Sequence, residues 1–313
     1  MHMQPSANRK ISGSRLILGC WRFDALAERE LCALLETAIG AGIDFFDHAD
    51  IYGQGRSEDL FGRAMASLGI KREEIAIQSK CGIRSGFYDS SRQHIVDSVD
   101  GSLKRLNTDY LDILLLHRPD ALMEPEEISE AFSTLQASGK VRHFGVSNFK
   151  PMQIELLKKN LPMPLIANQL QFGLAHTGMI DGGVNANLGN DGAVDRNGDV
   201  LEYSRLQGIR IQAWSPLQFG FFEGNFIDHP RFPELNRVLG ELADGSARNL
   251  DEGIEILIEV LEAAMEQLVQ EPKRLMKFNF VVNKTLDGVI SLLLSLFKRM
   301  LRDGWQEQRF TQV

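Results

Sequence analysis

Residues 44–53 read Asp-Phe-Phe-Asp-His-Ala-Asp-Ile-Tyr-Gly, and the rest of the chain can be understood from them. The first half of this stretch is an apolar run of the kind that forms buried strands. The second half brings four ionisable side chains into the turn where that strand would end: Asp47, His48, Asp50 and Tyr52. In a chain that alternates strands and helices, such groups at the carboxyl end of a strand indicate a reactive rim. Other strands should then end in reactive residues too.

A strand followed by a helix recurs along the chain at a spacing of roughly 30 residues. The expected strands are 15–19, 44–48, 75–80, 110–117, 143–147, 165–169 and 210–214. The expected helices are 28–41, 57–68, 93–106, 125–138, 150–159 and 233–243. Such alternation predicts parallel strands joined by helical crossovers. Seven or eight units of this kind indicate an α/β fold closed into a barrel.

Residues 173–200 interrupt this rhythm. They are rich in Gly, Asn and Asp, and the segment is too long for an ordinary connection, which indicates a functional or mobile loop. Its acidic residues lack the spacing of a helix–loop–helix calcium site, so turn formation is the favoured interpretation and no metal site is predicted. The residues in question are Asp191, Asp195, Asn197 and Asp199.

The tail from Asp244 onward is the second interruption. It contains a helical pattern at 250–270, a candidate eighth strand at 278–282 and an apolar helix at 289–301. That last helix either closes the barrel or binds a partner or a membrane surface. We therefore expect one domain over 1–313, with an atypical last unit in a divergent segment, 244–313.

Composition narrows the range of functions. The chain has 313 residues and a net charge of -8, which argues against a general nucleic-acid surface. Its three cysteines suit a reduced compartment better than a disulfide framework. No signal-peptide core is visible, and no uncharged apolar run reaches the length of a membrane span. A cytoplasmic protein is expected, and its oligomeric state is left open.

The other strand ends meet the expectation set by 44–53. Because the carboxyl ends of parallel barrel strands lie on one face, their side chains should converge on one mouth. Taken singly, a lysine or histidine at a strand end is more often structural. Convergence of several on one rim favours a reactive site. The residues at these ends are Asp47, Tyr52, Lys80, His117, Ser147, Asn148, Gln169, Trp214 and Ser215.

The chemistry of this set can be derived from its side chains. Tyrosine has a pKa of about 10 and keeps its proton at neutral pH, and a nearby lysine lowers that pKa by stabilising the phenolate. An aspartate would hold the lysine, and a histidine could hydrogen-bond a substrate oxygen. Together they could protonate a carbonyl oxygen while hydride reaches its carbon. No side chain supplies hydride, so a nicotinamide cofactor is implied.

The chain resembles the aldo-keto reductase superfamily, most of all its bacterial members, over residues 16–243. Seven short segments in the family's order carry the resemblance: Gly19-Cys-Trp-Arg-Phe23, Asp47-His-Ala-Asp-Ile-Tyr-Gly53, Ser79-Lys-Cys-Gly82, Leu116-His-Arg-Pro-Asp120, Gly145-Val-Ser-Asn-Phe149, Asn168-Gln169 and Ala213-Trp-Ser-Pro-Leu217. The resemblance implies a TIM (β/α)8 barrel and NAD(P)H-dependent reduction of aldehydes or ketones, or the reverse oxidation. It implies NADP(H) as cofactor, with NAD(H) as the alternative, and a small carbonyl compound as substrate.

The resemblance also assigns roles. Tyr52 would be the general acid, Lys80 would lower its pKa, Asp47 would pair with Lys80, and His117 would orient the carbonyl. The carboxamide of the nicotinamide would meet Ser147, Asn148 and Gln169, its ring would stack on Trp214, and Ser215 and Leu217 would begin the loop that meets the pyrophosphate. Gly19 and Trp21 complete the predicted set, with Trp21 as a pocket wall or, alternatively, a core tryptophan.

The tail leaves other functions open. The family's turn that grips the adenosine phosphate cannot be found after Ala243. A non-catalytic, cofactor-binding sensor or regulatory subunit on the same barrel is therefore the alternative to an enzyme. A chain with no function of its own is a third hypothesis.

Overall fold

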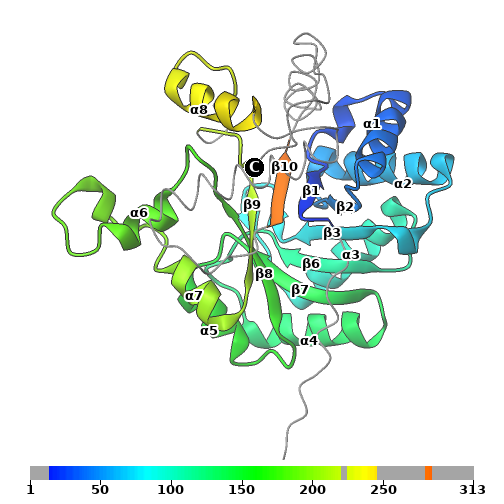
Figure 1. Cartoon of the computed structure of the whole chain (residues 1–313). Helices are drawn as coiled ribbons and strands as arrows, with labels where there is room; N and C mark the ends of the chain where they lie inside the picture. The colour runs from blue at the N-terminus through cyan, green and yellow to red at the C-terminus, as the bar shows by residue number, and fades with distance from the viewer. Residues whose placement is uncertain (1–13, 220–223, 245–278, 284–313) are drawn as a thin grey trace, which may run out of the picture.

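The computed structural model describes residues 14–219, 224–244 and 279–283. Its centre is a closed barrel of parallel strands in the order β1-β10-β9-β8-β7-β6-β3-β2, as Figure 1 shows. The expected α/β barrel is therefore confirmed. The barrel strands are β1 (Leu16–Gly19), β2 (Phe45–Asp47), β3 (Ala76–Cys81), β6 (Leu111–Leu116), β7 (Val141–Ser147), β8 (Leu165–Gln171), β9 (Arg210–Trp214) and β10 (Asn279–Asn283).

Helices surround the barrel (Figure 1). They are α1 (Glu28–Gly40), α2 (Arg56–Leu68), α3 (Arg92–Leu106), α4 (Pro125–Ala137), α5 (Pro151–Lys158), α6 (Gly178–Val184), α7 (Val200–Gln207) and α8 (Pro233–Asp244). Each helix expected from the sequence within the described residues is present. The helix α4 begins with Pro125 at its first position, where the missing N–H has no intrahelical acceptor to lose.

The candidate eighth strand is confirmed and closes the barrel. β10 pairs with β1 on one side and β9 on the other, and Val281 lies in register with both Ile17 and Trp214. The barrel therefore has no open edge along these strands. The expected helices at 250–270 and 289–301 lie outside the described residues.

The segment 173–200 is more ordered than expected. It contains α6 and leads directly into α7, neither of which was predicted, because its Gly, Asn and Asp residues favour turns. Turn formation itself is confirmed at Asp195, whose Oδ1 accepts the backbone N–H groups of Asn197 (2.7 Å) and Gly198 (2.8 Å). A hairpin of two very short strands, β4 (Ile83–Arg84) and β5 (Phe87–Tyr88), was also not predicted.

The barrel interior changes from apolar to polar toward the carboxyl ends of the strands. One apolar cluster fills it: Ile17, Phe45, Ala76, Ile113, Leu115 and Ala167. Because side chains alternate along a strand, Asp47 follows Phe45 on the same face of β2, and Gln78 and Lys80 follow Ala76 on β3. The strand period therefore places a polar layer directly above the apolar one.

All three cysteines are free thiols, as expected. Among the helices of the described ranges, none is both long enough and apolar enough to span a bilayer.

Candidate active site

A buried ion pair forms the base of the site. Lys80 Nζ donates to Asp47 Oδ2 at 2.6 Å, and both side chains have no exposed surface. Two amides also donate to Asp47 Oδ1, from Gln78 at 2.5 Å and Gln169 at 3.1 Å. A buried ion pair is stable only when the remaining hydrogen-bond donors and acceptors of both groups also have partners, and here the barrel interior supplies them. The pair is thus held rigidly beneath the rim.

Lys80 connects this pair to Tyr52. Its ammonium also donates to the backbone oxygen of His48 at 2.9 Å and to the Tyr52 hydroxyl at 3.2 Å. An ammonium has three N–H donors and no acceptor, so these bonds use its full capacity. The Tyr52 oxygen must therefore accept from Lys80, and the phenolic hydrogen is left free to point elsewhere.

The ionisation of these groups follows from burial and charge. Burial raises the pKa of Tyr52 above its usual value of 10, while the Lys80 cation acts in the lowering direction. The expected influence of Lys80 is present, but burial outweighs it. Burial would lower the pKa of Lys80, yet Asp47 and Tyr52 more than offset this and the pKa is raised. At neutral pH, Tyr52 is a phenol beside a cation.

His117 faces Tyr52 across the site. The two rings meet edge to face, with centroids 5.9 Å apart. Burial and the cations Lys80 and Arg118 hold the pKa of His117 well below 6.5, so its imidazole is neutral. The buried Nδ1 has no hydrogen-bond partner among the described residues. A neutral ring can donate one hydrogen bond to an oxygen placed between it and Tyr52.

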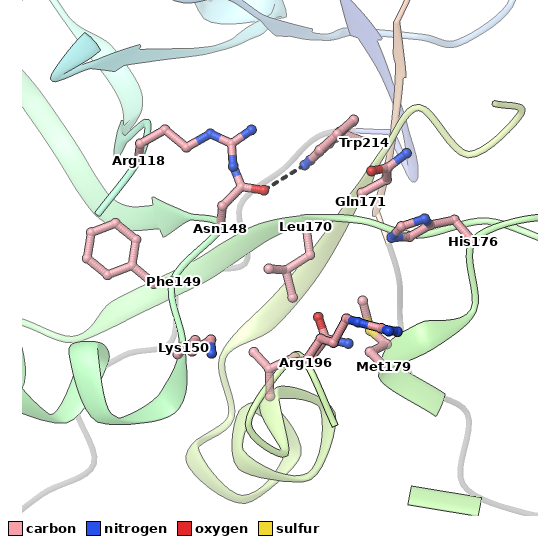
Figure 2. A pocket seen from close by; sticks show the side chains of 12 residues that line it. Arg118, Asn148, Phe149, Lys150, Leu170, Gln171, His176, Met179, Arg196 and Trp214 are labelled. Carbon is pink, nitrogen blue, oxygen red and sulfur yellow. Dashed lines mark hydrogen bonds between the residues drawn. The ribbon is translucent and has the colours of Figure 1, made fainter. Parts of the chain in front are cut away.

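A second group of polar residues lies at the ends of β7, β8 and β9. Ser147 Oγ donates to the Gln169 backbone oxygen at 3.0 Å, and Asn148 Nδ2 donates to Ser147 Oγ at 2.8 Å. The Trp214 indole N–H donates to Asn148 Oδ1 at 3.1 Å, which fixes the plane of the indole (Figure 2).

Two of these strand ends have an unusual backbone. Asn148 has φ 63° and Ser215 has φ 51°, both in the left-handed region that residues other than glycine rarely adopt. Asparagine tolerates this region well, whereas serine is strained there. The left-handed backbone at these two residues changes the direction of the chain after β7 and β9.

Most of the predicted site residues line one pocket of about 280 Å³. Gly19 and Leu217 do not line it, while Asp47 and Lys80 lie behind Tyr52. Trp21 is half-buried and lines the pocket, with its ring centroid 6.5 Å from that of Tyr52, so it is not a core tryptophan. The predicted residues that line it are Trp21, Tyr52, His117, Ser147, Asn148, Gln169, Trp214 and Ser215.

Several residues of this site were not predicted from the sequence. Ile51, Ile83 and Arg118 also line the pocket. Arg118 directly follows His117, a position that could have indicated it, whereas Ile83 belongs to the unpredicted hairpin. Gln78 and Gln212 exchange two amide hydrogen bonds of 2.9 Å across the barrel. A glutamine inside a strand carries no signal of this role.

The pocket fits a nicotinamide. The side-chain oxygens of Ser147, Asn148 and Gln169 can accept hydrogen bonds from the N–H groups of a carboxamide, while the N–H and O–H groups of these residues are engaged within the protein. The indole of Trp214, fixed by its hydrogen bond, offers a flat surface for an aromatic ring. The pocket volume also admits a ring of that size beside Tyr52 and His117.

Comparison with known proteins establishes the family. The model of the aldo/keto reductase family matches residues 15–270. The chain belongs to this family and is an aldo-keto reductase enzyme. It is 39% identical to the uncharacterized oxidoreductase YcsN of Bacillus subtilis (strain 168) over 276 residues. The match covers 83% of this chain and 85% of that one.

Two further comparisons cover much of the chain. A 6-dehydroglucose reductase of Agrobacterium fabrum is 35% identical over 231 residues, which are 69% of this chain and 72% of that one. The crystal structure of an aldo-keto reductase from Klebsiella pneumoniae in complex with NADPH superposes with a TM-score of 0.63. It is 21% identical and covers 96% of this chain and 94% of that one, so it supports the fold.

Proposed function

We propose that the protein reduces aldehyde or ketone carbonyls to alcohols with NADP(H), or with NAD(H) in its place. The observation that carries this proposal is the hydrogen bonding of Lys80. Its three donors are used by Asp47, the His48 backbone and Tyr52, so the phenolic proton of Tyr52 is available to a ligand in the pocket. A buried phenol beside a fixed cation is suited to give a proton to an oxygen that gains negative charge.

Each residue then has a role. A reduced nicotinamide, held at its carboxamide by Ser147, Asn148 and Gln169, would supply hydride to the carbonyl carbon and be oxidised. Tyr52 gives its proton to the carbonyl oxygen, and Lys80 stabilises the phenolate that remains. Asp47 keeps Lys80 charged and in place. His117 donates a hydrogen bond that orients the carbonyl oxygen.

The remaining assignments are also proposals. Gly19, Ser215 and Leu217 would serve the cofactor beyond its nicotinamide, and the preference for NADP(H) rests on the family resemblance. Three free thiols suit a reducing compartment such as the cytoplasm. The partner we propose is a small carbonyl compound.

The test combines binding and turnover. Tryptophan fluorescence should be quenched saturably by NADPH, and by NADH more weakly, because Trp214 lies at the nicotinamide site. A panel of aldehydes and ketones should then be reduced, and Tyr52→Phe should lower kcat by about 10²–10⁴ while leaving cofactor affinity intact. Full activity in Tyr52→Phe would overturn the mechanism. Saturable cofactor binding without any turnover would favour the sensor hypothesis.

A further inference from the structure

A second pocket, of about 240 Å³, opens beside the one described above. It lies between the ends of β7 and β8 and the segment that carries α6 and α7. The two pockets share Arg118, Asn148 and Trp214. A molecule with its carbonyl at Tyr52 could therefore extend into the second pocket.

The lining of this pocket is basic. Arg118, Lys150 and Arg196 line it, and none of the described lining residues is acidic. The side chains of these three cations form no salt bridge or hydrogen bond with another described residue. Figure 2 shows, in this view, Arg118 above Leu170 and the other two cations below it. Cations around a cavity without an anionic partner attract an anion.

Two neighbouring acids form hydrogen bonds within their own segments. Asp195, next to Arg196, bonds the backbone of its own turn, and Asp181 Oδ2 accepts from Thr177 Oγ1 at 2.8 Å. An independent sign of a missing acceptor comes from Gln171, which also lines the pocket. Its buried Nε2 has no hydrogen-bond partner within the described part of the chain. Buried donors are nearly always satisfied, so an acceptor is expected there.

We propose that the substrate is an anionic carbonyl compound, with a carboxylate or phosphate held by Arg118, Lys150, Arg196 and the amide of Gln171. This proposal rests on the function proposed above. Arg118 follows His117 in sequence and lines both pockets, so it links the anionic end of the substrate to the carbonyl end. The anionic group takes no part in the reaction: the carbonyl carbon gains hydride, its oxygen gains a proton, and the nicotinamide is oxidised. The pyrophosphate of the cofactor would bind elsewhere, because Ser215 and Leu217, the residues proposed to contact it, do not line this pocket.

The test compares 4-oxobutanoate with butanal, two aldehydes of equal chain length that differ in a terminal carboxylate. We expect kcat/KM to favour the anionic aldehyde at least about tenfold. Lys150→Gln and Arg196→Gln should each reduce this preference about threefold, mainly through KM, because both cations are exposed. Arg118→Gln should reduce the preference more, about tenfold, because Arg118 is half-buried. Lys71→Gln, an exposed cation outside both pockets, is the matched control and should leave the preference unchanged.

A binding measurement separates this proposal from the proposed function. Succinate, which cannot be reduced, should raise the melting temperature of the wild-type protein, and neutral succinamide should not. The rise should disappear in the double variant Lys150→Gln/Arg196→Gln. Carbonyl reduction without an anionic preference would overturn this inference and leave the function standing. Stabilisation by succinate without reduction of any carbonyl would overturn the proposed function, and with it the anionic carbonyl substrate, and would leave only an anion-binding site in this pocket. Weaker NADPH binding in the variants, with an unchanged preference, would assign the pocket to the cofactor and overturn the inference.

Discussion

At the residue scale, the site depends on Lys80. Its side chain has no exposed surface, and each of its three N–H donors has a hydrogen-bond acceptor. Asp47 and Tyr52 come from the end of β2 and Lys80 from the end of β3, and the pairing of these two strands brings the three side chains to one place. The sequence allowed these residues to be predicted because each follows an apolar strand. It did not reveal the amides of Gln78 and Gln212, since a polar residue inside a strand can equally face solvent.

Removing Lys80 tests this dependence. Lys80→Met should lower the free energy of unfolding by about 3–5 kcal/mol, because it leaves the Asp47 carboxylate buried without its cation. The double variant Lys80→Met/Asp47→Asn should recover most of that loss in urea denaturation. Neither variant should regain carbonyl reduction, because the phenolate would lack its cation. If the double variant is as unstable as the single one, the loss arises from packing rather than from charge.

His48 gives the fold a sensitivity to acid. Both its ring nitrogens are buried without partners among the described residues, and its ring packs against Phe61 at 4.5 Å between centroids. Burial, with Lys80 nearby, lowers its pKa to about 3 from 6.5. The unfolded state therefore takes up a proton below pH about 6.5 that the native state does not, and stability is lost as pH falls.

We expect His48→Leu to weaken this acid dependence. Between pH about 6 and 4, the slope of the free energy of unfolding against pH should fall by about 1.4 kcal/mol per pH unit, the effect of one proton. Urea titrations at a series of pH values would measure it. An unchanged slope would mean that His48 does not remain neutral in the folded protein.

At the scale of elements, the regular units were predictable and the irregular ones were not. The helix and strand periods between 15 and 169 predicted the elements well because each unit has one apolar face and a clear end signal. The helices α6 and α7 were missed, since Gly, Asn and Asp residues surround them and α6 itself has three glycines. The hairpin of β4 and β5 was missed because two-residue strands show no period.

The contact between α2 and α3 depends on one small residue. A Cβ at Gly62 would lie 2.5 Å from the Arg105 backbone oxygen and 2.9 Å from the Leu106 carbonyl carbon. Backbone atoms cannot give way as a flexible side chain does. The close approach of the two helices therefore requires glycine in α2.

Gly62→Ala should be destabilising although alanine is the better helix former. The gain of about 1 kcal/mol in helix propensity should be outweighed by overpacking, for a net loss of about 2 kcal/mol. The matched control is Gly40→Ala at the last residue of α1, where a new Cβ meets nothing within 4 Å. The control should be neutral or stabilising by up to about 1 kcal/mol in thermal unfolding. Equal effects at both positions would contradict the close packing of α2 on α3.

At the scale of the whole molecule, closure of the barrel depends on a strand that is distant from the others in sequence. β10 is inserted between β1 and β9, with Phe280 in register with Leu16 and Ala213. We propose on this ground that the chain forms one barrel domain over 1–313. The sequence suggested this strand but could not fix it, because a short apolar run is consistent with a strand or a buried helix segment.

Val281 lies in the interior of β10. Proline there removes the backbone N–H and is poorly tolerated in a strand paired on both sides, so Val281→Pro should lower the free energy of unfolding by about 3 kcal/mol or more. Val281→Thr is the control, since it keeps the N–H and the branched shape that suits strands. If the proline variant unfolds like the control in urea, β10 does not close the barrel in solution. A large loss would instead mean that the edges of β1 and β9 need this strand, and that the rim carrying Asp47 and Trp214 depends on a segment beyond the first seven units.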